Sequence, residues 1–128
     1  MKVLVDTSFL LLCVEKGKDF FSMLENKTAE RIEPVVPSEV LSELKRLAAK
    51  RGKKSKMALA ALQIAETMEK LAMEHEGSVD DALIYYAKKT NHPILTSDAK
   101  LMKKLASEKI EYLTVSSAGK PIVRLKFR

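Results

Sequence analysis

The sequence predicts an α/β domain whose central sheet is twisted, mainly parallel and flanked by helices. Short, nearly continuous apolar runs, typical of strands buried on both faces, alternate with longer stretches of helical periodicity. No repeat or linker interrupts this alternation. The length of 128 residues suits one domain, so we expect residues 1–128 to form a single folding unit.

Short extended segments supply the expected strands. Residues 2–6, KVLVD, begin the chain with the clearest apolar run. The last segment, residues 121–127, has the character of an edge strand. In chain order, we expect strands at residues 2–6, 32–37, 93–96, 111–115 and 121–127.

Helical periodicity fills the intervals between these strands. Residues 55–75 show it best, with apolar residues recurring on one face, and Gly77 is expected to end this helix. Gly52 stands where a C-cap glycine belongs after the preceding helix. In chain order, we expect helices at 8–26 with a break at Gly17, 38–50, 55–75, 78–89 and 98–107.

Composition limits the classes of protein to consider. The single cysteine, Cys13, excludes an internal disulfide and a zinc site of the usual kind, which favours a reducing cytoplasm. No apolar run approaches the ~20 residues needed to cross a bilayer, so we expect no membrane contact. The net charge of +6 favours a polyanionic partner such as RNA, although a lysine-rich solvated surface explains it equally well.

Two aspartates follow expected strands at their carboxyl ends. Asp6 ends the first strand, and Asp98 follows the strand at 93–96. In open α/β sheets, ligands bind beyond this edge of the sheet. Each aspartate alone could simply cap the next helix, but two of them at one edge favour a functional site.

The helix expected at 38–50 adds a third acid. On a helical wheel, Glu43 falls beside the apolar stripe, whereas Glu39 points well away from it. A residue at the margin of a buried face can look into a cleft. The alternative is an exposed carboxylate that pairs with Arg46 or Lys50.

Asp80 and Asp81 compete for a fourth position. Asp80 lies ~70° from the centre of its helix's apolar stripe, and Asp81 lies almost opposite that stripe. Ser78 and Asp81 also have the spacing of a capping box, with Ser78 as the N-cap. We therefore assign Asp80 to the site and Asp81 to the helix start, with Asp81 as a weaker candidate ligand.

The four selected acids are Asp6, Glu43, Asp80 and Asp98. Such carboxylates, with no histidine or thiolate nearby, repel one another unless a hard cation lies between them. Oxygen-only ligation suits Mg²⁺ or Mn²⁺. These ions activate water and stabilise charge on phosphoryl oxygens, so the sequence predicts metal-dependent phosphodiester hydrolysis.

Three segments resemble the PIN-domain family of ribonucleases. MKVLVDTSFLL resembles the family's opening strand and first aspartate. EVLSELKRL resembles the helix carrying its glutamate, which falls on Glu43. VDDALIYYAKKTNHPILTSD resembles the stretch with the last two acids, which fall on Asp80 and Asp98. The resemblance covers nearly the whole chain and is greatest to archaeal members of the Fcf1-like and VapC-like kinds.

This resemblance implies a three-layer PIN-like fold and an endoribonuclease that cuts RNA with Mg²⁺ or Mn²⁺. It implies either ribosomal-RNA processing or a toxin restrained by an antitoxin protein, and it favours a homodimer. By the same resemblance Thr7, Ser8 and Thr96 support the carboxylates, although turn and cap hydrogen bonds explain these hydroxyls equally well.

A basic run could hold RNA phosphates, or it could be an ordinary solvated connection between two helices. Its members are Lys45, Arg46, Lys50, Arg51, Lys53, Lys54 and Lys56.

One position departs from the family pattern. Many members carry a further acid two residues after the last aspartate, and here that position is Lys100. This leaves a second metal ion in doubt and keeps open an alternative, a catalytically weak PIN scaffold that binds RNA or ribosomal particles.

Overall fold

A computed structural model describes residues 1–72 and 77–126 of the chain. Its centre is a six-stranded sheet in the order β3-β2-β1-β4-β5-β6, in which only β6 runs antiparallel to its neighbour among the described strands. The strands are β1 Lys2–Val5, β2 Glu33–Pro37, β3 Glu69–Leu71, β4 Ile94–Leu95, β5 Tyr112–Val115 and β6 Pro121–Arg124.

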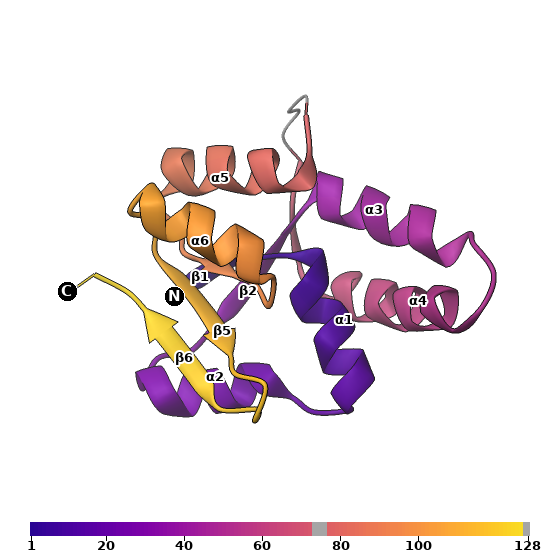
Figure 1. Cartoon of the computed structure of the whole chain (residues 1–128), viewed down its shortest axis with the longest axis horizontal. Helices are drawn as coiled ribbons and strands as arrows, with labels where there is room; N and C mark the ends of the chain where they lie inside the picture. The colour runs from indigo at the N-terminus through magenta and orange to yellow at the C-terminus, as the bar shows by residue number, and fades with distance from the viewer. Residues whose placement is uncertain (73–76, 127–128) are drawn as a thin grey trace.

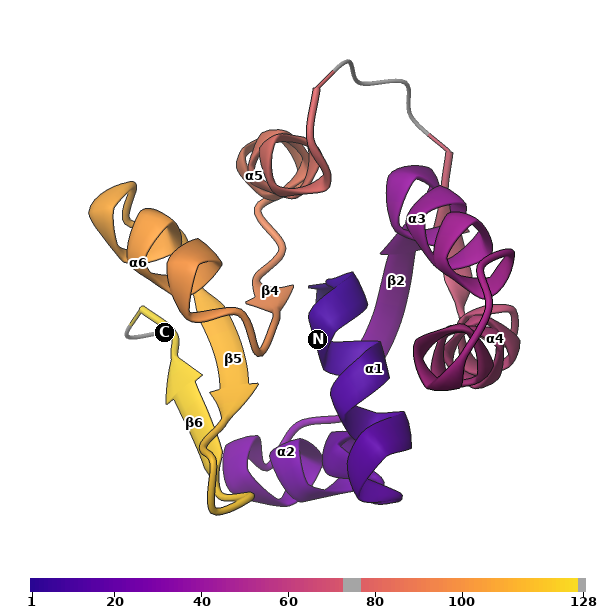
Figure 2. The ribbon, with the colours of Figure 1, turned by 45° about the vertical axis from the view of Figure 1, so that its right-hand side comes forward.

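Helices cover both faces of this sheet. They are α1 Thr7–Lys16, α2 Phe20–Thr28, α3 Ser38–Ala48, α4 Lys53–Ala65, α5 Val79–Thr90 and α6 Ala99–Ser107. Figures 1 and 2 show α5 and α6 grouped together, apart from α3 and α4. The predicted α/β architecture, with three layers and a mainly parallel sheet, is confirmed.

The period of two along each strand explains the two cores. In β1, Val3 and Val5 join a cluster with α1 to α4, while Leu4 between them joins a second cluster with α5 and α6. All three side chains are fully buried. A strand buried on both faces must be apolar, which is why Val3, Leu4 and Val5 form a continuous apolar run after the exposed Lys2.

The helix predicted at 55–75 is wrong beyond Ala65. The Thr67 hydroxyl donates to the Ile64 carbonyl at 2.7 Å, and the Met68 amide turns to the Ala65 carbonyl instead. The chain then pairs as β3 with the free edge of β2, with Glu69 opposite Val35. The predicted residues 73–75 of that helix lie outside the described residues.

Gly52 does not cap the helix before it, so that prediction is also wrong. α3 ends at Ala48, and Gly52 instead precedes α4 with φ 105° and ψ −169°. This region of backbone space is essentially restricted to glycine. Gly17, by contrast, does end α1, in the left-handed conformation with φ 61°, so the predicted break is confirmed.

Gly52→Ala is expected to lower the free energy of unfolding by about 1–3 kcal/mol. No atom lies within 4 Å of the place where the new Cβ would stand, so the whole cost is conformational. Urea unfolding measures the change. Lys54→Ala, an exposed change in the first turn of α4, serves as the control and should stay within ~0.5 kcal/mol of the parent. Equal stability of Gly52→Ala and the parent would contradict this backbone conformation.

Among the helices that the described residues form, none combines the length and the apolar character needed to cross a membrane.

Candidate active site

The candidate site lies where β1 and β4 end. These neighbouring strands are parallel, with Val5 opposite Leu95, so their carboxyl ends share one edge of the sheet. Asp6 directly follows β1. Thr96 directly follows β4 and leads to Asp98, the N-cap of α6.

Two hydroxyls hold the Asp6 carboxylate. Its Oδ2 accepts hydrogen bonds from Ser8 Oγ at 2.6 Å and from Thr96 Oγ1 at 2.7 Å. The Ser97 amide donates to Ser8 Oγ, and the Asp98 amide donates to Thr96 Oγ1. Because the hydroxyl oxygens accept from these amides, their hydrogens are left to point at Asp6.

Thr7 does not use its hydroxyl in this arrangement, and only its backbone acts on Asp6, by lowering the pKa of that residue. Its hydroxyl is buried and has no hydrogen-bond partner in the described part of the chain. Neither the predicted support of a carboxylate nor a cap hydrogen bond is seen for Thr7. Ser8 and Thr96, in contrast, do contact a predicted carboxylate.

Burial raises the pKa of Asp6. The residue is only 4% exposed, and the resulting desolvation raises its pKa above the usual 3.8. Hydrogen bonds from Ser8 and Thr96 oppose this rise because they stabilise the charged form. The negative charge of Asp80 adds to the rise.

Ser8→Ala is expected to raise the pKa of Asp6 further, because the carboxylate then loses one of its two hydroxyl donors. Titration of the Asp6 carboxyl carbon by NMR measures the shift. Ser107→Ala is the control, since that hydroxyl donates to the Lys104 carbonyl and leaves Asp6 untouched. An unchanged Asp6 titration in Ser8→Ala would show that this hydrogen bond does not form.

Asp80 lies in the first turn of α5 and is half-buried. Burial raises its pKa above 3.8, and the negative charges of Asp98, Glu43 and Asp81 raise it further. The negative charges of the other predicted acids therefore act on the pKa of Asp80, and the negative charge of Asp80 acts on the pKa of Asp6. The selected carboxylates act on one another electrostatically from β1, α3, α5 and the start of α6.

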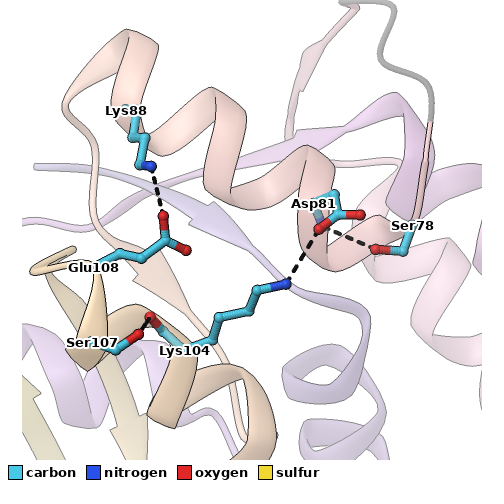
Figure 3. A network of polar contacts seen from close by, with 6 residues as sticks. All are labelled: Ser78, Asp81, Lys88, Lys104, Ser107 and Glu108. Carbon is cyan, nitrogen blue, oxygen red and sulfur yellow. Dashed lines mark hydrogen bonds and ion pairs between the residues drawn. The ribbon is translucent and has the colours of Figure 1, made fainter.

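Asp81 contacts Ser78 and Lys104, which lie outside the group of four selected acids (Figure 3). It is exposed, and its amide donates to Ser78 Oγ at 3.1 Å, which confirms Ser78 as the N-cap of α5. Lys104 Nζ of α6 lies 3.3 Å from Asp81 Oδ1. Hydrogen bonds from Lys104 and then Ser78 lower the pKa of Asp81. A second ion pair, Lys88 with Glu108, joins the far end of α5 to α6.

Asp98 is the N-cap of α6, so the alternative prediction of a capping role for this residue is confirmed. Its Oδ1 accepts hydrogen bonds from the Lys100 amide at 2.9 Å and the Leu101 amide at 3.3 Å. Asp6 differs, because its side chain accepts no capping bond from α1 within the described residues. Glu43 is half-buried on α3.

The donor set fits a hard divalent cation in its chemistry. It consists of carboxylate oxygens. Burial, and to a smaller extent the charges of neighbouring acids, raise the pKa values of Asp6 and Asp80, and a bound cation would offset both effects. In the conformation described, however, no three acidic, histidine or cysteine side chains of residues 1–72 and 77–126 lie close enough to hold one ion.

Glu39 is a contributor that the helical wheel missed. The hydroxyl of Tyr86, a fully buried side chain of α5, donates to Glu39 Oε2 at 2.6 Å. Ser38 Oγ donates to the other oxygen at 3.2 Å. Glu39 does point away from the apolar stripe of α3, but α5 packs on that side. This contact ties the helix of Glu43 to the helix of Asp80.

The predicted basic run covers the second half of α3, the following connection and the start of α4. Figures 1 and 2 show this connection on the outer side of the helix pair, away from α5 and α6. The exposed members are Lys45, Arg46, Lys50, Arg51, Lys53, Lys54 and Lys56.

Comparison with known proteins gives consistent matches over most of the chain. A family model described as a PIN-like domain matches residues 3–117. The ribonuclease VapC4 of Methanocaldococcus jannaschii is 29% identical over 117 residues, which cover 89% of each chain.

Two solved structures share the fold. The structure of the PIN domain endonuclease Utp24 matches with a TM-score of 0.79 and 27% identity, over 97% of this chain and 92% of that one. A domain of a functionally unknown protein from Methanocaldococcus jannaschii matches with a TM-score of 0.68 and 19% identity, over 99% of both chains. The latter likeness concerns the fold alone.

Proposed function

The chain belongs to the PIN-like domain family, and from this membership we propose that it is a metal-dependent endoribonuclease that hydrolyses phosphodiester bonds of RNA. The observation that carries the proposal is the buried Asp6 at the sheet edge. Two hydroxyls donate hydrogen bonds to its carboxylate, and the negative charge of Asp80 acts on its pKa. The similar proteins named as a ribonuclease and an endonuclease support it.

We assign Asp6, Glu43, Asp80 and Asp98 as the catalytic carboxylates and as ligands of Mg²⁺ or Mn²⁺, with Asp81 as a weaker candidate. Such an ion, when bound, supplies a Lewis acid that stabilises charge on the phosphoryl oxygens and promotes ionisation of water. For Asp98 to serve as a ligand with both oxygens, its Oδ1 must leave the amides that it caps.

The chain's own residues fix the geometry around that ion. Ser8 and Thr96 hold Asp6 in one orientation, so the carboxylate needs no rearrangement when substrate binds. The Tyr86 to Glu39 hydrogen bond keeps α3 beside α5 and thereby sets the separation of Glu43 and Asp80. Preorganisation of this kind lowers the cost of reaching the transition state.

Two biological roles fit the same family membership. One is a toxin, which would act as a homodimer in the cytoplasm and bind an antitoxin protein, and the other is ribosomal-RNA processing. The similar proteins are named as a ribonuclease and as an endonuclease, which supports RNA cleavage in either role. Growth arrest on expression of the parent, with normal growth on expression of Asp6→Asn, would favour the toxin.

Cleavage of a labelled structured RNA tests the proposed activity. The parent and Asp6→Asn are compared with Mn²⁺, Mg²⁺ or EDTA. We expect products only from the parent and only with metal. Products that persist in Asp6→Asn would show that the acids are wrongly assigned or that a contaminant cuts. No products under any condition would overturn the nuclease.

Two observations favour a second candidate, an RNA-binding PIN scaffold with weak catalysis. Within the described residues no three acids gather around one point, and Lys100 is a cation beside Asp98. This candidate predicts salt-sensitive RNA binding that persists in EDTA, without products in Mn²⁺. Replacing Lys45 and Arg46 with alanine would then reduce the salt dependence of binding, if the basic run holds phosphates. Turnover at enzyme concentrations well below substrate would exclude the scaffold.

A further inference from the structure

An open cavity of about 720 Å³ lies next to the candidate active site. Its walls are the end of α1, part of α6 and the β5–β6 hairpin. Ser97 lines the cavity, and the amide of this same residue donates to Ser8, which holds Asp6. We call this cavity the hairpin groove. None of the four selected acids lines the groove, and Ser97 is the residue that connects it with the acidic site.

Positive charge predominates in the hairpin groove. Lys16, Lys18 and Arg124 line it together with one carboxylate, Glu15. All three basic residues are exposed. Among the described residues, the four ion pairs involve other lysines, so these three cations remain available to an anionic ligand.

Part of the lining is apolar. Tyr112 of β5, Ile122 of β6 and Met102 of α6 are each half-buried there. A ligand that carries only charge, such as free phosphate or an acidic peptide, would leave this surface unused. A ligand with both phosphates and flat apolar groups would use both parts of the lining.

Four small residues form another part of the lining. Ser116, Ser117, Ala118 and Gly119 form the turn between β5 and β6. Hydrogen bonds from the Ser116 amide to the Lys120 carbonyl and from the Gly119 amide to the Ser116 carbonyl, both 2.8 Å, fix this turn. Small side chains let a ligand backbone approach the turn closely, and the serine hydroxyls can donate to it or accept from it.

We propose that the hairpin groove binds the unpaired RNA strand next to the scissile phosphate, with phosphates at Lys16, Lys18 and Arg124 and a base against Tyr112. This inference rests on the proposed nuclease function. The strand must be unpaired because a base in an A-form duplex has its faces stacked and its pairing edge occupied. The cavity falls within the ~300–1,000 Å³ typical of sites that enclose a small organic group, which suits a nucleotide.

Binding of a short unpaired oligoribonucleotide in EDTA tests the groove without cleavage. Removing one cation that binds a phosphate should reduce the slope of log affinity against log salt by about 0.7. Arg124→Gln should therefore bind more weakly and show this reduced slope. Tyr112→Leu should bind about tenfold more weakly, with the slope unchanged. Lys27→Gln is the charge-matched control, because Lys27 is exposed on α2 and does not line the groove.

A titration of ¹⁵N-labelled parent protein with the same RNA locates the contact without any substitution. The amide signals of Ser117 and Gly119 should shift, whereas that of Lys27 should not. Unmoved hairpin signals would overturn the groove, as would an Arg124→Gln slope equal to that of Lys27→Gln. Equal affinity for a fully paired RNA would overturn the requirement for an unpaired strand.

Cleavage assays separate this inference from the proposed function. If the parent binds RNA through the hairpin in EDTA but yields no products in Mn²⁺, the proposed RNA-binding groove is supported and the proposed nuclease function is contradicted. If the parent cuts RNA while the groove variants keep the parent's affinity and salt slope, the proposed nuclease function is supported and the proposed RNA-binding groove is contradicted. Absence of both binding and cleavage overturns both.

Discussion

Asp80→Asn is expected to slow RNA cleavage by roughly 10²–10³-fold and at the same time to stabilise the folded protein at neutral pH. The loss of activity and the gain in stability have one cause, the negative charge of Asp80. Burial and the neighbouring acids raise the pKa of Asp80 above the 3.8 of an unperturbed aspartate, so its ionised form is unfavourable in the folded chain. The same charge is what a divalent cation would require.

The pH dependence of this stabilisation follows by linkage. Stability contributed by the protonated Asp80 is fully present below pH 3.8 and is lost as pH rises through the raised pKa of the folded state. The amide of Asn avoids that loss. Its advantage in urea unfolding should therefore be present at neutral pH and should disappear as pH falls toward 3.8.

Asp81→Asn is the matched control on the adjacent residue. Lys104 and Ser78 lower the pKa of Asp81, so its charged form stabilises the fold above pH 3.8. The variant should be slightly less stable than the parent at neutral pH and should cleave RNA at close to the parent's rate. Loss of cleavage in Asp81→Asn with retention in Asp80→Asn would reverse the assignment of the two residues.

Bound metal should make the parent more stable than Asp80→Asn. A cation that binds only the folded state stabilises it by about 2.7 kcal/mol at a hundredfold excess over its dissociation constant. Adding Mg²⁺ or Mn²⁺ should raise the melting temperature of the parent and leave that of Asp80→Asn nearly unchanged. An equal rise in both proteins would mean that the ion binds elsewhere.

Tyr86→Phe is expected to lower the free energy of unfolding by about 1–3 kcal/mol. The substitution removes the hydroxyl that donates to Glu39 Oε2 and leaves a part-buried carboxylate one donor short. It also removes the tie between α3 and α5, so cleavage should slow even where the protein remains folded.

Glu39→Gln serves as the comparison for this prediction. Its amide oxygen can still accept from Tyr86, so we expect a smaller loss of stability than in Tyr86→Phe. Urea unfolding gives the stability, and single-turnover cleavage under folded conditions gives the effect on the site. Parent-like stability of Tyr86→Phe would show that this hydrogen bond contributes nothing.

Features that depend on local sequence could be predicted. The apolar run of β1 predicted a buried strand, Ser78 predicted the start of α5, and Gly17 predicted the end of α1. The helical wheel also separated Asp80, which is half-buried, from Asp81, which is exposed. Each of these depends on chemistry within one or two turns of the residue.

Features that depend on a partner element could not be predicted. β3 has the sequence Glu-Lys-Leu, which lacks any strand pattern, and it forms because β2 offers an unpaired edge. Glu39 looked irrelevant on the wheel of α3 because the wheel omits α5. For Asp98 the sequence left two roles open, a ligand and an N-cap, and only the structure shows that its Oδ1 accepts hydrogen bonds from the start of α6.

The hydrogen bond from Thr96 to Asp6 joins residues 90 positions apart in the chain. During synthesis, Asp6 leaves the ribosome early, but its partner and Asp98 follow only when most of the chain has emerged. A nascent chain therefore carries an incomplete acidic site for most of its translation. The proposed cleavage of RNA can therefore begin only late in synthesis, after Asp98 has emerged and the sheet edge has formed.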